Sequence, residues 1–505
     1  MKEIRPYLIV ISAILSFLSF PPFPFGPLIF VTLALFLYSV EDLPPWEAFK
    51  YGYLWGMVFH IGLLYYIGWV TVPGMIATVL ILSLIPAVTC LVFVKLYSRN
   101  SALALVFVPA FFLAWNWLLT KSDLNYPWTD FGYALSYFLP LIQAAELGGV
   151  YLISLLIIVV NLFVYRSISP RMGLSSASRR GSQYIAVLIV IALYFYGQVR
   201  LSHQKEESGT RDLTVALIQG NVTKDIKWNP NALQYSFDRY FELSRKAAAV
   251  GAELIIWPET AIPTYLAQEP ANMAKVKAFV DTLNLPVLTG VVYYETVGPE
   301  EYDVFNSAIF LTPHNPGFGL YSKIHLVPMS EKIPFSERYR KLREIRLGQA
   351  DFSSGRDMTI FHSEKADFST LICFESTFPR FASEFCRRGA EMLVVITNDM
   401  WFGKTSLFEQ HAMMAVFRAI ENRVPVVRAA NTGISMAIDK WGNIQAKSGI
   451  FKEEYLVVDV YPEESSSLYN RIGDVIPQAA FVITLVSLAV AFWRRRKHIE
   501  VRYAR

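Results

Sequence analysis

The sequence is poor in charged residues. Only 17% of its 505 residues are Asp, Glu, Lys or Arg, whereas 53% are hydrophobic, and the formal net charge is +4. A soluble globular chain usually carries about 25% charged residues. This deficit indicates a protein that is partly embedded in a lipid bilayer. Its basic run, Arg494 to Lys497, directly follows an apolar stretch, as at the end of a membrane span, so no nucleic-acid partner is expected.

Cysteine is scarce as well. The three cysteines, Cys90, Cys373 and Cys386, are too few for a disulfide framework, and their spacing matches no zinc site. Cys90 lies in an apolar run and is expected to be a packing residue, while Cys373 and Cys386 are expected to remain thiols. We therefore expect neither a metal ion nor another cofactor.

Long apolar runs predict membrane spans, because a bilayer-spanning helix needs roughly 20 mostly apolar residues. Residues 6–40 carry no charge, and a proline-rich break at 21–27 divides them into two short spans. A cleaved signal peptide is the alternative for the first span, but no small-residue cleavage site follows it. Residues 51–94 hold two more spans that break near Val72-Pro73-Gly74. Further uncharged runs are 101–120, 147–165, 181–199 and 475–493.

The prediction is therefore a polytopic α-helical domain with about eight spans. Residues 1–200 form a transmembrane domain of about seven helices, and a C-terminal transmembrane helix covers 473–494. Positive charge marks cytoplasmic loops. Basic side chains precede the first span and follow the fourth, sixth and eighth: Lys2, Arg5, Lys95, Arg99, Arg166, Arg171, Arg179, Arg180 and Arg494 to Lys497. Alternating spans place all of them on one side, with both termini and a basic tail at 495–505 in the cytoplasm.

The polar segment between the seventh and eighth spans, residues 211–465, is consequently expected outside the cytoplasm. Short apolar runs alternate there with amphipathic stretches, which indicates a layered α/β domain. Expected strands are Thr214–Gln219, Leu254–Trp257, Val287–Val292, Ser307–Leu311, Thr370–Cys373, Leu393–Thr397, Ser435–Ile438 and Leu456–Val460. Expected helices are Ala232–Val250, Met273–Leu283, Arg380–Arg388 and Leu407–Arg423.

Three residues of this segment suggest nucleophilic chemistry. Cys373 ends an apolar strand, where α/β sheets present reactive groups, although a lone cysteine there is more often a packing residue. A nucleophile needs a base and an oxyanion donor. Glu259 follows another apolar strand beside Trp257, where poor solvation would raise its pKa; a solvent-exposed glutamate is the alternative. Lys323 can bring a positive charge to an oxyanion, and a surface lysine is the alternative.

The three residues together resemble a known pattern. A strand ending at Glu259, the Tyr-x-Lys-x-His-Leu-Val-Pro motif around Lys323, and a strand ending at Cys373 resemble the Glu-Lys-Cys triad of the carbon–nitrogen hydrolase (nitrilase) superfamily. The resemblance covers residues 212–460 and keeps the superfamily's chain order. It implies an αββα sandwich without a metal. It also implies that Glu259 is the general base, Lys323 the oxyanion stabiliser and Cys373 the nucleophile.

A nitrilase-like catalytic domain between membrane spans resembles the apolipoprotein N-acyltransferase family. The Asn-Asp-Met-Trp-Phe-Gly sequence at 398–403 is similar to that family's signature. The resemblance implies that Glu331 and Glu375 are supporting acids. It also implies that Trp228, in a substrate-gating arm, contacts substrate together with Phe374 and Trp401. Phe374 stands where this family commonly has Tyr, and the fifth span lacks the Glu and Arg expected near residues 114–117.

This second resemblance implies ping-pong acyl transfer by a monomer in the bacterial inner membrane. A phospholipid would donate a fatty acyl chain, through a thioester on Cys373, to the α-amine of the diacylglyceryl-modified N-terminal cysteine of a lipoprotein. The first alternative is a membrane-tethered amidase or nitrilase that uses the same triad to hydrolyse small amides. The second is a transporter or receptor whose external domain only binds ligand, which predicts that Glu259, Lys323 and Cys373 are far apart.

Overall fold

The computed structural model describes residues 4–203, 212–227, 231–299, 301–336, 338–339 and 351–503. The chain forms two compact units. The helical unit comprises Met1–Gly68, Val72–Val199 and Asp474–Arg505, and the α/β unit comprises Trp69–Thr71 and Arg200–Gly473.

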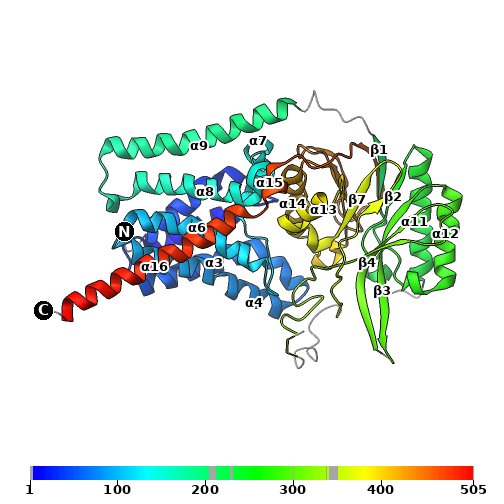
Figure 1. The fold of residues 1–505 in the computed structure, drawn as a ribbon, viewed down its shortest axis with the longest axis horizontal. Helices are drawn as coiled ribbons and strands as arrows, with labels where there is room; N and C mark the ends of the chain where they lie inside the picture. The colour runs from blue at the N-terminus through cyan, green and yellow to red at the C-terminus, as the bar shows by residue number, and fades with distance from the viewer. Residues whose placement is uncertain are drawn as a thin grey trace. The chain divides into compact units, whose positions relative to one another are not determined.

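The helical unit is built from long apolar helices (Figure 1). They are α1 (Arg5–Leu18), α2 (Ile29–Val40), α3 (Pro45–Leu64), α4 (Val72–Leu82), α5 (Leu84–Tyr97), α6 (Ser101–Leu119), α8 (Ala145–Ile168), α9 (Ser176–Ser202) and α16 (Val475–Tyr503). Within the described residues, four segments are long and apolar enough to cross a membrane: Val72–Tyr97, Ser101–Leu119, Ala145–Ile168 and Ser176–Ser202. Three apolar helices are shorter, at Arg5–Leu18, Gly26–Val40 and Val475–Val490.

The loops that carry the predicted positive charges lie at one end of the helical unit. The Tyr165 hydroxyl donates a hydrogen bond of 2.6 Å to Glu41, which joins the ends of α8 and α2. The Arg171 guanidinium lies 5.3 Å from the centre of the Tyr97 ring, which joins the α8–α9 connection to the end of α5. The N-terminal end of α1 and the C-terminal end of α16 lie at the same end (Figure 1).

The α/β unit contains two six-stranded sheets among its described residues. The first sheet has the order β12 (Glu454–Val460), β1 (Leu213–Gln219), β2 (Leu254–Ile256), β3 (Val287–Gly298), β4 (Glu301–Leu311) and β5 (Gly319–Ser322). The second has the order β11 (Ile444–Lys447), β10 (Met436–Ile438), β9 (Val426–Ala430), β8 (Met392–Thr397), β7 (Asp367–Ile372) and β6 (Phe361–His362).

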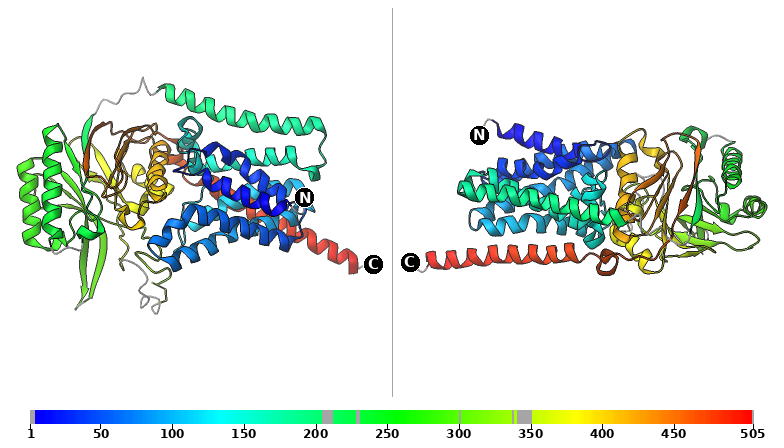
Figure 2. Two further views of the ribbon diagram at one scale, coloured as in Figure 1. Left: turned by 180° about the vertical axis from the view of Figure 1, so that it is seen from behind. Right: turned by 90° about the horizontal axis from the view of Figure 1, so that it is seen from above.

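The two sheets form the inner layers of an αββα sandwich (Figures 1 and 2). β4 contacts β7 and β1 contacts β9 across the sheet interface. Helices α11 (Ala232–Ala249) and α12 (Pro270–Leu283) cover the first sheet, and α13 (Pro379–Arg387) and α14 (Leu407–Asn422) cover the second. Helices on the outer faces explain why β2, β8 and β9 are buried throughout, since both faces of each strand are covered. The predicted nitrilase-type architecture is confirmed for this part of the chain.

Each expected strand and helix of the α/β unit is present. Most ends shift by one to three residues, but β3 and β4 were predicted too short. β3 continues six residues beyond Val292, and β4 begins six residues before Ser307. The strand that was expected to include Cys373 stops at Ile372, because Cys373 begins a short 3₁₀ helix, η8 (Cys373–Thr377). Four strands were not predicted: β5, β6, β9 and β11. The central part of β1 pairs in parallel with β2 and the whole of β1 pairs antiparallel with β12, so that Leu213 lies opposite Val460.

Candidate active site

Cys373 lies at a sharp turn between a strand and a helix. It follows β7, has a φ of 53°, and begins η8, after which α13 starts at Pro379. A positive φ is unfavourable for a residue with a Cβ and persists only when surrounding contacts enforce it. Burial and the nearby Glu259 charge raise the pKa of the Cys373 thiol, while Lys323 lowers it. The resting group is therefore a thiol that must lose its proton during the attack on a carbonyl.

Glu259 is buried directly after β2, as the apolar sequence before it predicts. Its two carboxylate oxygens accept hydrogen bonds from the Asn306 side-chain amide at 2.6 Å and from the Asn398 backbone N–H at 2.8 Å. Burial raises the pKa of Glu259, with Lys323 acting in the opposite direction and Glu331 in the same direction. A carboxylate with a raised pKa is a better proton acceptor for a thiol.

Lys323 is completely buried and pairs with a second acid. Its ammonium lies 2.8 Å from the Glu331 carboxylate, which also accepts a hydrogen bond of 3.1 Å from the Asn306 side-chain amide. Burial lowers the pKa of Lys323, but the charges of Glu331, Cys373 and Glu259 outweigh burial and raise it. The ammonium therefore stays charged, as an oxyanion stabiliser requires. Asn306, which joins Glu259 to Glu331, was not identified from the sequence.

Glu375 ties the cysteine turn to the segment that carries the lysine. Its carboxylate accepts hydrogen bonds from the backbone N–H groups of Ile324 at 2.7 Å, His325 at 3.1 Å and Ile372 at 2.8 Å. The Tyr321 hydroxyl donates a further bond of 2.7 Å. Burial raises the pKa of Glu375 to about 7, against the effect of these hydrogen bonds. Both predicted supporting acids, Glu331 and Glu375, are thus buried beside the predicted triad.

Hydrogen bonds link the segments that carry the three predicted residues. The Asn306 amide bridges Glu259 and Glu331, and Glu331 pairs with Lys323. Glu375 accepts hydrogen bonds from Ile324 and Ile372, the chain neighbours of Lys323 and Cys373. The ligand-binding transporter or receptor alternative predicts that the three residues are far apart, and these links argue against it. Phe374 is buried and packs edge-on against Phe378, with ring centres 5.1 Å apart. Trp401 lies in η9 (Asp399–Phe402), with its ring centre 5.6 Å from the Lys224 ammonium. Trp228, predicted to contact substrate, lies outside the described residues.

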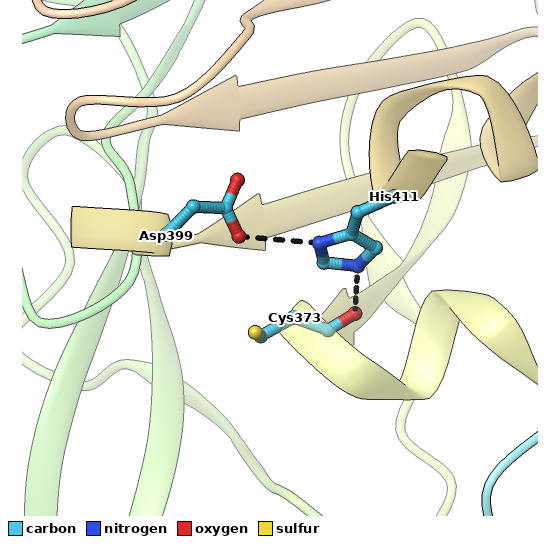
Figure 3. A group of neighbouring side chains, drawn as sticks. All are labelled: Cys373, Asp399 and His411. Carbon is cyan, nitrogen blue, oxygen red and sulfur yellow. Dashed lines mark hydrogen bonds and ion pairs between the residues drawn. The ribbon is translucent and has the colours of Figure 1, made fainter. Parts of the chain in front are cut away.

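A second network of buried polar side chains lies next to the cysteine turn (Figure 3). Asp399 lies 3.1 Å from His411 Nδ1 and 2.8 Å from the Arg428 guanidinium. His411 Nε2 lies 3.1 Å from the Cys373 carbonyl oxygen. Burial raises the pKa of Asp399, but Arg428 and His411 outweigh burial and lower it to about 2. His411 and Asp399 were missed as site residues, although the helix and the motif that contain them were recognised.

Cys373, Asp399 and His411 offer one ligand atom each within 4.8 Å, a spacing that a metal ion could bridge. The chemistry of the cluster does not fit a cation. Arg428 already neutralises Asp399 at 2.8 Å, and its guanidinium also lies 3.1 Å from His411 Nδ1. The other ring nitrogen faces a carbonyl oxygen, which can only accept, so it carries a proton rather than a free lone pair.

Two six-stranded sheets between layers of helices, with a cysteine at a strand-to-helix turn, form the architecture expected for a carbon–nitrogen hydrolase. The carbon–nitrogen hydrolase family matches residues 214–469. The apolipoprotein N-acyltransferase N-terminal domain family matches residues 12–163. The chain is also 35% identical to an apolipoprotein N-acyltransferase of Geobacter metallireducens over 98% of its own length and 96% of the relative's. The chain belongs to the apolipoprotein N-acyltransferase family, within the nitrilase superfamily.

More distant relatives carry the same name. The chain is 28% identical to an apolipoprotein N-acyltransferase of Chlorobaculum tepidum, over 97% of each chain. It is 28% identical to another from Vibrio cholerae, over 98% of each chain. Among solved structures, an amidase from Nesterenkonia aligns with 53% of this chain and 94% of its own, at 19% identity and a TM-score of 0.39. The predicted family and the predicted acyltransferase class agree with the full-length relatives.

Proposed function

We propose that this chain moves a fatty acyl chain from a phospholipid to the α-amine of the diacylglyceryl-modified N-terminal cysteine of a lipoprotein. One observation carries the proposal. The buried side chains of Glu259 and Lys323 are linked through Asn306 and Glu331, and Glu375 links the lysine segment to the Cys373 turn. The same chain has apolar helices long enough to cross a membrane. A relative that matches 98% of the chain's length is named apolipoprotein N-acyltransferase.

In the first half-reaction, Glu259 takes the proton from the Cys373 thiol, and the thiolate attacks the carbonyl carbon of the phospholipid ester. Lys323 stabilises the negative charge that develops on the carbonyl oxygen. The ester C–O bond then breaks, and the leaving alkoxide of the lysophospholipid takes the proton from Glu259. The acyl group remains on Cys373 as a thioester.

In the second half-reaction, the α-amine of the lipoprotein cysteine attacks the thioester carbonyl. Glu259 takes a proton from the attacking nitrogen, the C–S bond breaks, and the Cys373 thiolate recovers its proton from Glu259. Glu331 holds Lys323, and Glu375 holds the cysteine turn, in both half-reactions. Phe374, Trp401 and Trp228 contact the acyl chains or the polypeptide of the substrates. This protein acts as a monomer and uses no cofactor.

The substrates explain the membrane part, since both are anchored in a bilayer. We propose that about eight helices span the bacterial inner membrane. The catalytic domain then lies on the periplasmic side, with both termini in the cytoplasm. The distribution of basic loops and their position at one end of the helical unit support this orientation. Cysteine labelling tests it: a cysteine introduced at Ser465 should react with an impermeant maleimide in spheroplasts, and one at Ser176 should not.

Intact-mass analysis of the purified full chain tests the reaction. After exposure to phospholipid vesicles, we expect one fatty acyl adduct, mapped to Cys373 and absent from Cys373→Ala. Addition of a diacylated lipopeptide with a free α-amine should remove the adduct and yield an amide-linked product. Acylation of Cys373→Ala, or release of the acyl group to water in the presence of lipopeptide, would contradict the proposal. Hydrolysis of small soluble amides without lipid would instead support the membrane-tethered amidase.

A further inference from the structure

The backbone carbonyl of Cys373 is held by two side chains that the reaction does not use. The Ser376 hydroxyl donates a hydrogen bond of 2.8 Å to it, and His411 Nε2 lies 3.1 Å from it. Ser376 Oγ and His411 Nε2 also lie 3.1 Å apart. The carbonyl can only accept, and the Ser376 proton is already committed to it. We assign a proton to His411 Nε2, because the N–H then donates to the Cys373 carbonyl oxygen.

The rest of the network fixes this tautomer. Nδ1 of His411 faces the Arg428 guanidinium at 3.1 Å and the Asp399 carboxylate at 3.1 Å, and Asp399 also accepts a bond of 3.0 Å from Thr397. Burial, followed by Arg428, lowers the pKa of His411, while Asp399 opposes the shift. With its proton on Nε2, the neutral ring accepts through Nδ1 from the Arg428 guanidinium, which also donates to Asp399 and so offsets the repulsion between these two acceptors. The imidazole is thereby held from both sides in a buried position.

The held carbonyl determines where the thiol points. The carbonyl oxygen of Cys373 points toward the imidazole, and the sulfur points away from it (Figure 3). A φ of 53° is strained for cysteine, so the turn would relax if its carbonyl lost a partner. Rotation of this peptide would carry Sγ away from Glu259 and Lys323.

We propose that His411 is a positioning residue, whose Nε2–H holds the Cys373 carbonyl and so presents the thiol to Glu259 and Lys323. This proposal rests on the proposed function for its acyl-transfer readout. It adds to the proposed mechanism a side chain, His411, that contacts neither the substrate nor the Cys373 sulfur. Asp399 and Arg428 act behind His411 by fixing its ring and its proton.

Two variants distinguish the hydrogen bond that His411 donates from the packing of its side chain. In His411→Gln, the Nε2 amide can still reach the Cys373 carbonyl, whereas in His411→Asn the amide reaches only the position of Nδ1. His411→Asn should slow the formation of the acyl-enzyme about 100-fold, because displacement of a reacting group by about 1 Å costs that much. Its KM for phospholipid should stay within about 3-fold of wild type. His411→Gln should retain a rate within about 10-fold of wild type.

Alkylation of Cys373 by iodoacetamide, followed against pH by peptide mass, gives a readout that does not involve phospholipid. His411→Asn should lose the part of the pH dependence of the alkylation rate that arises from Glu259. His411→Gln should keep it. Ser376→Ala removes the other hydrogen-bond donor to the Cys373 carbonyl and should also lower the rate of alkylation. His362→Asn is the matched control, because His362 also pairs with an aspartate, Asp367 at 2.9 Å, but on an exposed strand.

Wild-type rates in His411→Asn would overturn the proposal. Equal losses in both variants, with equally lowered melting temperatures, would also overturn it, since His411 would then only fill space. If wild type alkylates normally but never forms an acyl adduct with phospholipid, the proposed function fails. The alkylation comparison then still decides the role of His411.

Discussion

The ammonium of Lys323 and the carboxylate of Glu331 lie 2.8 Å apart in the interior of the α/β unit. Lys323→Met should therefore lower both the acylation rate and the unfolding free energy. Removal of a preorganised oxyanion donor lowers the acylation rate about 10²–10³-fold. Removal of one partner of a buried ion pair costs about 3–5 kcal/mol of unfolding free energy.

The double variant Lys323→Met/Glu331→Gln separates these effects. It removes the Glu331 charge that Lys323→Met leaves without its partner, so the melting temperature should recover most of the loss while the acylation rate stays low. Differential scanning fluorimetry and the intact-mass assay measure the two quantities. Recovery of acylation along with stability would show that Lys323 has only a structural role.

A close backbone approach sets the position of the general base. A Cβ on Gly290 would lie 2.6 Å from Glu259 Cα and 2.6 Å from the Thr260 nitrogen, both of which are backbone atoms. Gly290→Ala should therefore displace Glu259 and lower the acylation rate about 100-fold. Gly317→Ala is the control, because a Cβ there meets only the Asn315 side chain at 3.4 Å. Equal acylation rates in the two variants would contradict this prediction.

The pH dependence of acylation follows from the environment of Glu259. Burial, assisted by Glu331 and Asp399 and opposed by Lys323, raises the pKa of Glu259 above 4.5. Only the ionised carboxylate accepts a proton, so the rate should fall as pH drops through this raised pKa. The acidic limb of the rate profile should thus lie above pH 4.5.

Glu331→Gln removes one of the negative charges that raise this pKa, so its residual activity should show an acidic limb at lower pH than wild type. Glu384→Gln, a change in a surface cluster with Arg380, is the control and should leave the limb in place. A limb that does not move in Glu331→Gln would mean that another group controls the profile.

Asn431 connects the loop after β1 to the loop that supports Glu259. Its side chain pairs with both backbone groups of Val222, at 2.9 and 2.8 Å, and donates to the Asn398 side chain at 3.1 Å. Asn431→Ala leaves these buried groups without partners and should cost about 1–3 kcal/mol of unfolding free energy. Asn315→Ala, in an exposed turn, should cost about 0.5 kcal/mol or less. Thermal unfolding of the two variants in detergent compares them.

The sequence predicted the elements with strong local signals. Burial of one or both faces gives a strand or a helix a recognisable hydrophobic pattern. This pattern is clear in the apolar strands before Glu259 and Cys373 and in the amphipathic helices at 232–250 and 407–423. The strands β5, β6 and β11 escaped prediction because they are short, and much of their stability comes from pairing with neighbours at the sheet edges. β9 is buried throughout, but it follows α14 so closely that no composition change separates the two.

The same contrast applies to the candidate site. Glu259, Lys323 and Cys373 each sit beside apolar residues in a recognisable motif, and the structure gathers them. Asn306 was missed because its role depends on two partners, Glu259 and Glu331, that lie 47 and 25 positions away in sequence. His411 was missed because a histidine on a buried helix face gives no local sign of what its nitrogens meet.

The pairing of β1 with β12 places the first and last strands of the α/β unit side by side, with Leu213 opposite Val460. The polypeptide therefore enters and leaves this folding unit at neighbouring points. A module with adjacent ends can be inserted into a loop of another protein without distorting either partner. A permuted α/β unit with its original ends joined and new ends at the exposed 314–317 turn should therefore still fold.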